Sequence, residues 1–181
     1  GDSTETVTID AGTGTTSVGV IGTGTEIGTL SIGSAQNGGI TLNGAITTDG
    51  VITIDGPITL ATAAITITTA DDNINLQGTV DGGKALTLAS GSGGVTVDGA
   101  IGSSTALTSL TVNSSGTGTI EITNIGTASA SGVTNTTAIG NTNTGTLTLD
   151  GTVYTTTAGQ TYTAALGQNI DITNTSGTTF T

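Results

Sequence analysis

The stretch VTVDGAIG, from Val95 to Gly102, decides the fold because it is one of several near-copies of a single phrase. In each copy a polar residue and a glycine stand between two aliphatic residues, with one small residue after the glycine. The spacing of the copies indicates a unit of about 22 to 26 residues, which is typical of repeat proteins. The other copies are LNGAI (Leu42 to Ile46), IDGPI (Ile54 to Ile58), LQGTV (Leu76 to Val80) and LDGTV (Leu149 to Val153).

Short triads, each with a polar residue between two aliphatic ones, accompany these phrases. Successive side chains of a strand point to opposite faces, so each triad predicts a short strand with one dry face. Thr is roughly a quarter of the chain and 31 residues are Gly, both poor helix formers, so no helix is expected. The triads are Val7 to Ile9, Ile40 to Leu42, Ile65 to Ile67, Leu86 to Leu88, Val95 to Val97, Leu110 to Val112, Ile120 to Ile122, Leu147 to Leu149 and Ile170 to Ile172.

The triads and phrases together predict an all-β chain folded as a parallel β-helix, or β-solenoid, of about seven or eight coils. Each coil lays its triads on those of the coil below. Triads at positions 30, 52, 74, 95, 120, 147 and 170 predict one ladder, and those at 40, 65, 86 and 110 predict a second. The residues expected inside the stack are Val95, Val97, Ile120, Ile122, Leu147 and Leu149.

An antiparallel β-sandwich, as in a pilin-like subunit, is the alternative fold. Asp-Gly occurs five times, and the pair suits either a coil corner with a positive-φ glycine or a two-residue hairpin turn. The triads are short for hairpins, and the phrase returns only once per two or three triads, which favours the solenoid. Disorder is a third interpretation, because Val, Ile, Leu and Phe together make up only slightly more than the roughly 20% below which a charged chain is usually disordered. The five Asp-Gly pairs begin at Asp49, Asp55, Asp81, Asp98 and Asp150.

A single domain, residues 1–181, is expected, with uneven regularity along it. The aromatic residues Tyr154, Tyr162 and Phe180 all lie near its C-terminal end and mark either a larger local core or a partner-facing end. The chain starts with Gly1 rather than Met, so we expect it to be processed or cut from something longer. The expected regions are a less regular N-terminal strand region (1–29), the most regular coils (30–125), a Thr/Asn/Ser/Gly-rich loop or widened coil (126–146) and C-terminal coils (147–181).

The charge balance excludes two classes of partner. The chain has 13 acidic residues and one basic residue, Lys84, for a net charge of −12. Nucleic-acid backbones and anionic lipid headgroups need clustered Lys or Arg, so neither is expected to bind. Membrane insertion is not expected either, because no apolar run approaches the 18 or more residues of a spanning helix.

Catalytic chemistry is not expected, so no catalytic, cofactor-binding or metal-binding residue is assigned. Without His, Cys or Arg, the common general bases and nucleophile activators are missing. Paired carboxylates for glycoside hydrolysis would be the surviving option, but the one adjacent pair, Asp71 and Asp72, is predicted at a solvated corner. Calcium binding would be incidental, since the Gly-Gly-x-Gly-x-Asp repeat is absent. Glycosylation sequons at Asn113, Asn135 and Asn174 are no more frequent than chance predicts.

Two segments resemble the repeats of large secreted bacterial surface proteins of the filamentous-haemagglutinin-like and autotransporter-adhesin type. They are VTVDGAIGSSTALTSLTVNSSG (Val95 to Gly116) and GTVYTTTAGQTYTAAL (Gly151 to Leu166), within a similarity over about residues 40–181. The resemblance implies a right-handed parallel β-helix in an extended adhesive or structural fibre. It implies no functional residues, because those repeats have no catalytic motif.

These observations predict an extracellular structural protein at the cell surface that assembles with copies of itself, end to end, into a filament. Adhesion to a host or neighbouring cell surface is a further expected role. The first and last coils of a solenoid expose unpaired backbone groups, and the sequence offers no polar cap or helix to cover them. A monomeric adhesin rod is one alternative. The other is an ice-binding β-solenoid, which needs Thr-x-Thr in one rank on successive coils, whereas pairs such as Thr66 and Thr68 do not recur in each coil.

Overall fold

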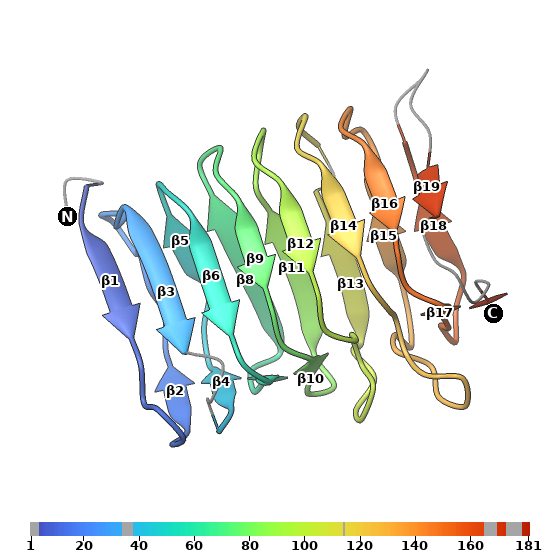
Figure 1. Ribbon diagram of the computed structural model, residues 1–181, viewed down its shortest axis with the longest axis horizontal. Coiled ribbons are helices and arrows are strands. Elements are labelled where there is room, and N and C mark those ends of the chain that lie inside the picture. Colours follow the sequence, from blue (N-terminus) through green and yellow to red (C-terminus); the bar gives the residue numbers. More distant parts are fainter. Residues whose placement is uncertain (1–3, 34–37, 114, 165–169, 173–178) are drawn as a thin grey trace.

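The chain winds into a stack of coils that contribute strands to three parallel sheets (Figure 1). The computed structural model describes residues 4–33, 38–113, 115–164, 170–172 and 179–181. These residues contain no helix, and all of the paired strands named below run parallel. The predicted β-solenoid is therefore confirmed, with about seven turns, and the antiparallel sandwich is wrong.

Sheet A is one continuous ladder that runs the length of the stack and lies in front in Figure 1. It pairs the predicted triads in register, for example Ile74 with Val95 and Val95 with Ile120. The triad ladder predicted from position 30 to position 170 is thus present. The strands, in ladder order, are β1 (Thr6–Ile9), β3 (Thr29–Gly33), β6 (Ile52–Asp55), β9 (Ile74–Leu76), β12 (Val95–Val97), β14 (Ile120–Ile122), β16 (Leu147–Leu149) and β19 (Ile170–Ile172).

Sheet C is the second long ladder and lies behind sheet A in Figure 1. The predicted triads at 65, 86 and 110 pair there in register. Its strands are β5 (Ile46–Thr48), β8 (Ala64–Thr69), β11 (Ala85–Ala89), β13 (Ser109–Val112), β15 (Thr137–Ile139) and β18 (Gln160–Tyr162).

Sheet B closes the third side of the stack and was not foreseen as a separate ladder. Single bridges at Ile101 and Ile125 continue it between Val80 and Tyr154. The triad at Ile40 belongs here, paired with Thr16 and Ile58, so its assignment to the second ladder was wrong. Each coil passes three sides rather than two, which one-dimensional spacing did not reveal. The strands are β2 (Thr16–Val18), β4 (Ile40–Leu42), β7 (Ile58–Leu60), β10 (Val80–Asp81), β17 (Val153–Tyr154) and β20 (Thr179–Phe180).

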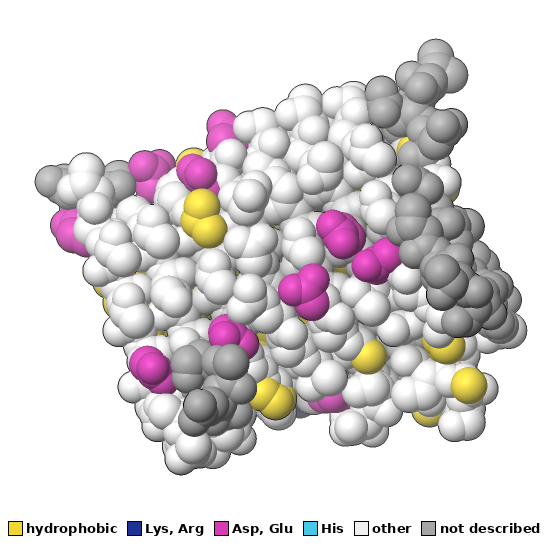
Figure 2. All heavy atoms as spheres, in the orientation of Figure 1, with side chains coloured by type: hydrophobic (Ala, Val, Ile, Leu, Met, Phe, Trp, Pro, Cys, Tyr) yellow, Lys and Arg dark blue, Asp and Glu magenta, His cyan; other side chains and the backbone are white. Residues whose placement is uncertain are grey.

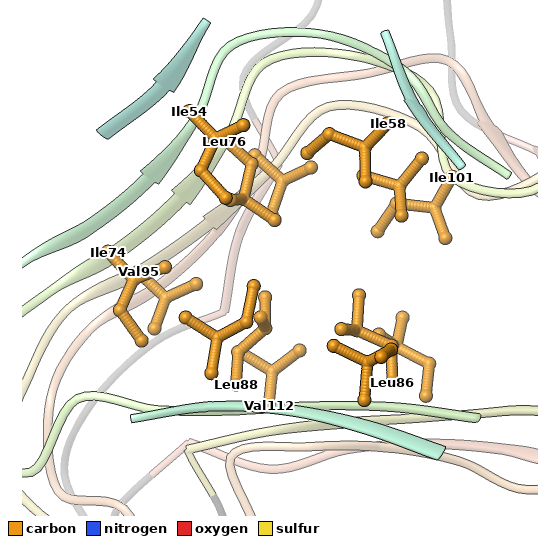
Figure 3. Close-up of a cluster of buried hydrophobic side chains, with 14 of the residues drawn as sticks. Ile54, Ile58, Ile74, Leu76, Leu86, Leu88, Val95, Ile101 and Val112 are labelled. Carbon is orange, nitrogen blue, oxygen red and sulfur yellow. The ribbon is translucent and has the colours of Figure 1, made fainter. Parts of the chain in front are cut away.

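The interior is a column of aliphatic side chains pointing inward from all three sides (Figure 3). Ile74 and Val95 enter from sheet A, Ile58 from sheet B and Leu86 from sheet C, each at most 2% exposed. Full burial of such a side chain stabilises a fold by roughly 1.5–3 kcal/mol. All six residues predicted inside are buried: Val95, Val97, Ile120, Ile122, Leu147 and Leu149.

The glycine of the repeated phrase is needed because neighbouring coils approach closely at one corner. Four copies of the phrase follow strands of sheet A, whereas the copy at Leu42 to Ile46 follows β4 and turns toward sheet C. A Cβ added to Gly78 or Gly99 would lie under 3.0 Å from the backbone of the preceding coil, at Gly56 and Gly78 respectively. Close stacking therefore explains the phrase better than turn geometry does.

The prediction of positive φ at the Asp-Gly pairs is only partly right. Gly56 and Gly82 have positive φ, whereas Gly50, Gly99 and Gly151 do not. At the latter three, an added Cβ would lie under 3.0 Å from backbone atoms of the preceding coil. Glycine is selected at those positions by contact with the coil beneath.

The corner between sheets C and A is lined by buried polar side chains that were not predicted. Ser90 Oγ donates a hydrogen bond to the Gly93 carbonyl at 2.5 Å, and Asn113 Nδ2 donates to Ser90 Oγ at 2.8 Å. Asn143 Nδ2 donates to the Gly118 carbonyl at 2.7 Å. Buried polar groups cost free energy unless they are paired, so this column holds the corner by satisfying backbone carbonyls from inside.

Candidate functional surfaces

In the part of the chain that the structure describes, the N-terminal end of the stack presents an open parallel edge. Among the described residues β1 pairs with β3 and has no strand on its other side. Thr29 N donates to the Glu5 carbonyl, and the backbone groups of a parallel strand alternate between its two neighbours. The N–H and C=O groups of Thr6 and Thr8 therefore point away from the stack.

The opposite end presents the complementary edge. Within the described ranges β19 pairs with β16 alone, and β18 pairs with β15 alone. The same alternation directs the backbone groups of Ile170 and Ile172 away from the stack. The Ile170 side chain is 39% exposed, whereas its ladder partner Leu147 is 1% exposed. The side chains of the ladder are therefore less buried at its end than one coil further in.

The two ends match one another in size and pattern. Val7 pairs with Leu30, and Leu147 pairs with Ile170, so both end coils advance 23 residues along the chain. Both edge strands are aliphatic-polar-aliphatic triads, VTI at one end and IDI at the other. A second copy placed on the C-terminal edge would continue the sheet A ladder in register, with Val7 of that copy following Ile170.

The outer face of sheet A is polar and carries acidic residues. Its central rank contains Glu121, which is exposed, and the register position of Asp171. Figure 2 shows this side of the molecule, where Asp and Glu side chains are spread over the surface. The full rank is Thr8, Ser31, Thr53, Asn75, Thr96, Glu121, Thr148 and Asp171.

The outer face of sheet C, from β5 to β18, has a different chemistry and carries no charged residue. One rank pairs Thr66, Thr87 and Thr111 in register and ends, beyond Ala138, at Thr161. The Thr66/Thr68 pair of β8 faces Thr87/Ala89 on β11, so the second threonine does not recur. The outward side chains are Thr47, Ala64, Thr66, Thr68, Ala85, Thr87, Ala89, Ser109, Thr111, Ala138 and Thr161.

The adjacent carboxylates, Asp71 and Asp72, lie exposed at the corner after β8, as expected. Asp71 Oδ1 accepts hydrogen bonds from Ser92 N at 2.8 Å and Ser92 Oγ at 2.9 Å. These bonds, the backbone one first, lower the pKa of Asp71 below its usual value. Asp71 therefore ties one coil to the next.

Other polar side chains at the corners also bridge coils. Asp81 Oδ1 accepts from Ser104 N and Thr105 N, and Asn124 Oδ1 accepts from Thr152 N and Val153 N. In the described part of the chain, no three acidic, His or Cys residues gather closely enough to hold a metal ion. The absence of cofactors, metals and enzyme activity stays a prediction.

The three sequons lie in different surroundings. The Asn113 side chain is 1% exposed and hydrogen-bonded to Ser90, so it is closed to modification in the folded chain. Asn135 is exposed, and Asn174 lies outside the described residues.

Tyr154 enlarges the core near the C-terminal end, which is one of the two interpretations offered for the aromatic residues. Its hydroxyl donates to the Ile122 carbonyl at 2.7 Å and accepts from Gly151 N at 3.0 Å. Tyr162 meets it edge to face, with ring centroids 6.1 Å apart. Burial raises the pKa of Tyr154 to about 12 and also raises the pKa of Tyr162. The Phe180 side chain lies outside what the structure describes.

Comparison of the chain with known protein families, with curated proteins and with solved structures finds no match. In the part of the chain that the structure describes, no helix is long and apolar enough to span a membrane. The two ends of the stack and its two long faces are therefore the features that bear on its function.

Proposed function

We propose that this chain is an extracellular structural protein whose copies stack end to end into a filament at the cell surface. The observation that carries the proposal is the match between the open edges at Thr6 and Thr8 and at Ile170 and Ile172. Unpaired strand edges are templates for another chain. A contact between two different ends does not close on itself, so it propagates as a filament.

The energetics of the ends favour a second copy over solvent. Stacking would bury Val7, Ile9 and Ile170, which are partly exposed or exposed at the edges. Each Å² of apolar surface removed from water stabilises the contact by about 25 cal/mol. It would also pair backbone groups along the new ladder. The chain's net charge of −12 opposes association, so we expect added salt to promote assembly.

An extracellular setting agrees with the composition. Lys84 is the single tryptic site, and the chain has three aromatic residues, so trypsin has one possible cut and chymotrypsin has few. The resemblance to secreted bacterial fibre proteins points the same way. Adhesion to a host or neighbouring cell surface belongs to the same proposal, with the filament presenting its faces repeatedly, and a monomeric rod is the alternative.

Proline at position 8 tests the end contact directly. The Thr8 N–H points away from β3, so Thr8→Pro removes an edge donor while the β1–β3 bonds remain. We expect this variant to stay folded by circular dichroism and to sediment as a monomer. Thr8→Ala, the matched control, should form filaments like the original chain, as seen by ultracentrifugation and negative-stain microscopy.

A mixing experiment keeps the test decisive. The Thr8→Pro variant retains its C-terminal edge, so it should add to a growing stack and block the next addition. Small amounts should shorten filaments of the original chain. If Thr8→Pro assembles like the original chain, or if the original chain stays monomeric at high concentration and salt, end-to-end stacking is wrong and the isolated rod is favoured.

A further inference from the structure

We infer that stacked copies pair side by side through the outer face of sheet C, so that the occupant of this face is a second copy of the same chain. The inference rests on the proposed end-to-end filament, because a stack repeats the same contact along its length. The face itself is present in each subunit. The contact would be isologous, with the same surface on both partners.

Charge is unevenly distributed over the outer faces of the stack. From β5 to β18 the outward side chains of sheet C are Thr, Ala and Ser alone. The described acidic residues lie on sheet A, on β10, at the corners or near the first coil. Four acids border the face. Glu26 and Asp49 lie beside its first strand, because Ile27 bridges to Thr48 and Asp49 directly follows β5, and Asp71 and Asp72 lie at the corner after β8. Two chains of net charge −12 repel each other, and sheet C forms the long face whose strands carry no carboxylate among their outward side chains.

The side chains on the outer face of sheet C are small enough for two such faces to pack closely. Thr, Ala and Ser are small, and they recur in register on successive coils, as Thr66, Thr87 and Thr111 do. Sheets with such faces can approach within the roughly 10 Å of packed sheets without gaps from long side chains. Burying Ala and the Thr methyl groups costs little side-chain entropy, and the hydroxyls can bond across the contact or through water.

The area of the sheet C face determines whether single subunits or stacks can pair. Six strands at about 4.8 Å spacing, with about four residues of 3.3 Å each, present a face on the order of 400 Å². A stable interface commonly buries about 800 Å² on each partner, so two single subunits would not stay paired. A stack multiplies the same contact along its length, and linked contacts bind far more tightly than one. Side-by-side pairing should therefore follow stacking and not precede it.

Cysteine substitution measures the contact, because the chain contains no cysteine. Thr87→Cys places a thiol in the middle of sheet C, and Thr96→Cys places one in the middle of sheet A as the matched control. Both positions are partly exposed and outward on short strands. With a flexible bis-maleimide, filaments of the Thr87→Cys variant should form covalent dimers roughly tenfold faster than filaments of the control. Equal rates, or faster dimers from the control, would overturn the inference.

Two further arms separate this inference from the filament proposal. Thr87→Glu should convert paired filaments into single ones under the microscope, whereas Thr96→Glu should not. If the original chain forms no filaments but concentrated Thr87→Cys protein is still cross-linked selectively, stacking fails and the face contact stands. If filaments form without selective cross-linking, the face contact fails and stacking stands.

An ice-binding face would give a different result. Thermal hysteresis from micromolar protein that is lost in Thr87→Glu, together with no selective cross-linking of Thr87→Cys, would assign the face to ice and overturn pairing between copies.

Discussion

The coils before Val97 and those after it share the sheet A ladder but differ in how they are closed. From Ile52 to Ile74 and from Ile74 to Val95 the chain advances 22 and 21 residues, whereas the next two turns take 25 and 27. In the wider turns sheet B shrinks to single bridges at Ile101 and Ile125. The ladder keeps its register because extra residues leave the coil at its corners, as in the turn between Thr127 and Ala130. Strand pairing in sheet A is therefore the same along the stack, and differences in coil length are confined to the corners.

A buried charge in either region tests whether the wider coils are as tightly packed as the narrow ones. Ile74→Asp and Ile120→Asp each place a carboxylate in the dry column, where the present side chains are at most 1% exposed. An unpaired buried charge costs about 3–5 kcal/mol of unfolding free energy. We expect equal losses in urea unfolding for both variants. A clearly smaller loss for Ile120→Asp would mean that the wide coils are loosely packed.

The glycine corner that follows sheet A should be intolerant of a single methyl group. Gly99→Ala would press a Cβ into the backbone at Gly78, and overpacking of this kind costs roughly 1–3 kcal/mol. Gly159→Ala is the matched control, because an added Cβ there meets nothing within 4 Å. Thermal unfolding should separate the two variants. If both melt alike, the close approach of coils does not explain the repeated phrase.

Tyr154 fills the interior beside the wide coil that begins at Ile120. Tyr154→Phe should cost roughly 1–3 kcal/mol of unfolding free energy, because Gly151 N and the Ile122 carbonyl each lose one hydrogen bond. The raised pKa means that the neutral phenol is favoured in the folded chain. Its contribution is therefore complete below pH 10 and is lost as the pH rises from about 10 toward about 12. Urea unfolding at several pH values should show the gap between the two proteins closing over that range. A constant gap would contradict the burial of the hydroxyl.

The smallest effect is expected at Asp71, an exposed link between narrow coils. Its pKa is lowered by Ser92, so the link contributes stability above the usual Asp pKa and loses it as the pH falls through the lower folded value. Asp71→Asn should melt slightly below the original chain at neutral pH and converge with it in strong acid. Asp72→Asn is the neighbouring control, because it leaves the hydrogen bonds between Asp71 and Ser92 in place, and it should melt like the original chain at neutral pH.

The sequence predicted the ladder of sheet A because its signal is local: an aliphatic-polar-aliphatic triad buries its outer residues wherever it lies. The third side of the coil was missed because β10 and β17 are two residues long and the bridges at Ile101 and Ile125 leave no triad. The role of Gly78 and Gly99 was mistaken because contact between coils is invisible in one strand's sequence. The uncharged face of sheet C was hidden for the same reason, since its threonines come together only in register.

Head-to-tail stacking is tested most directly by joining the two ends covalently. Thr8→Cys and Asp171→Cys, made as separate variants and mixed under oxidising conditions, should form a mixed disulfide dimer, because stacking would place these positions about 4.8 Å apart, within the Cα separation of a disulfide. Thr8→Cys mixed with Thr96→Cys is the control and should give little dimer. A mixed dimer in the first pair alone is the predicted result, and equal yields in both pairs, or none in the first, would contradict end-to-end assembly.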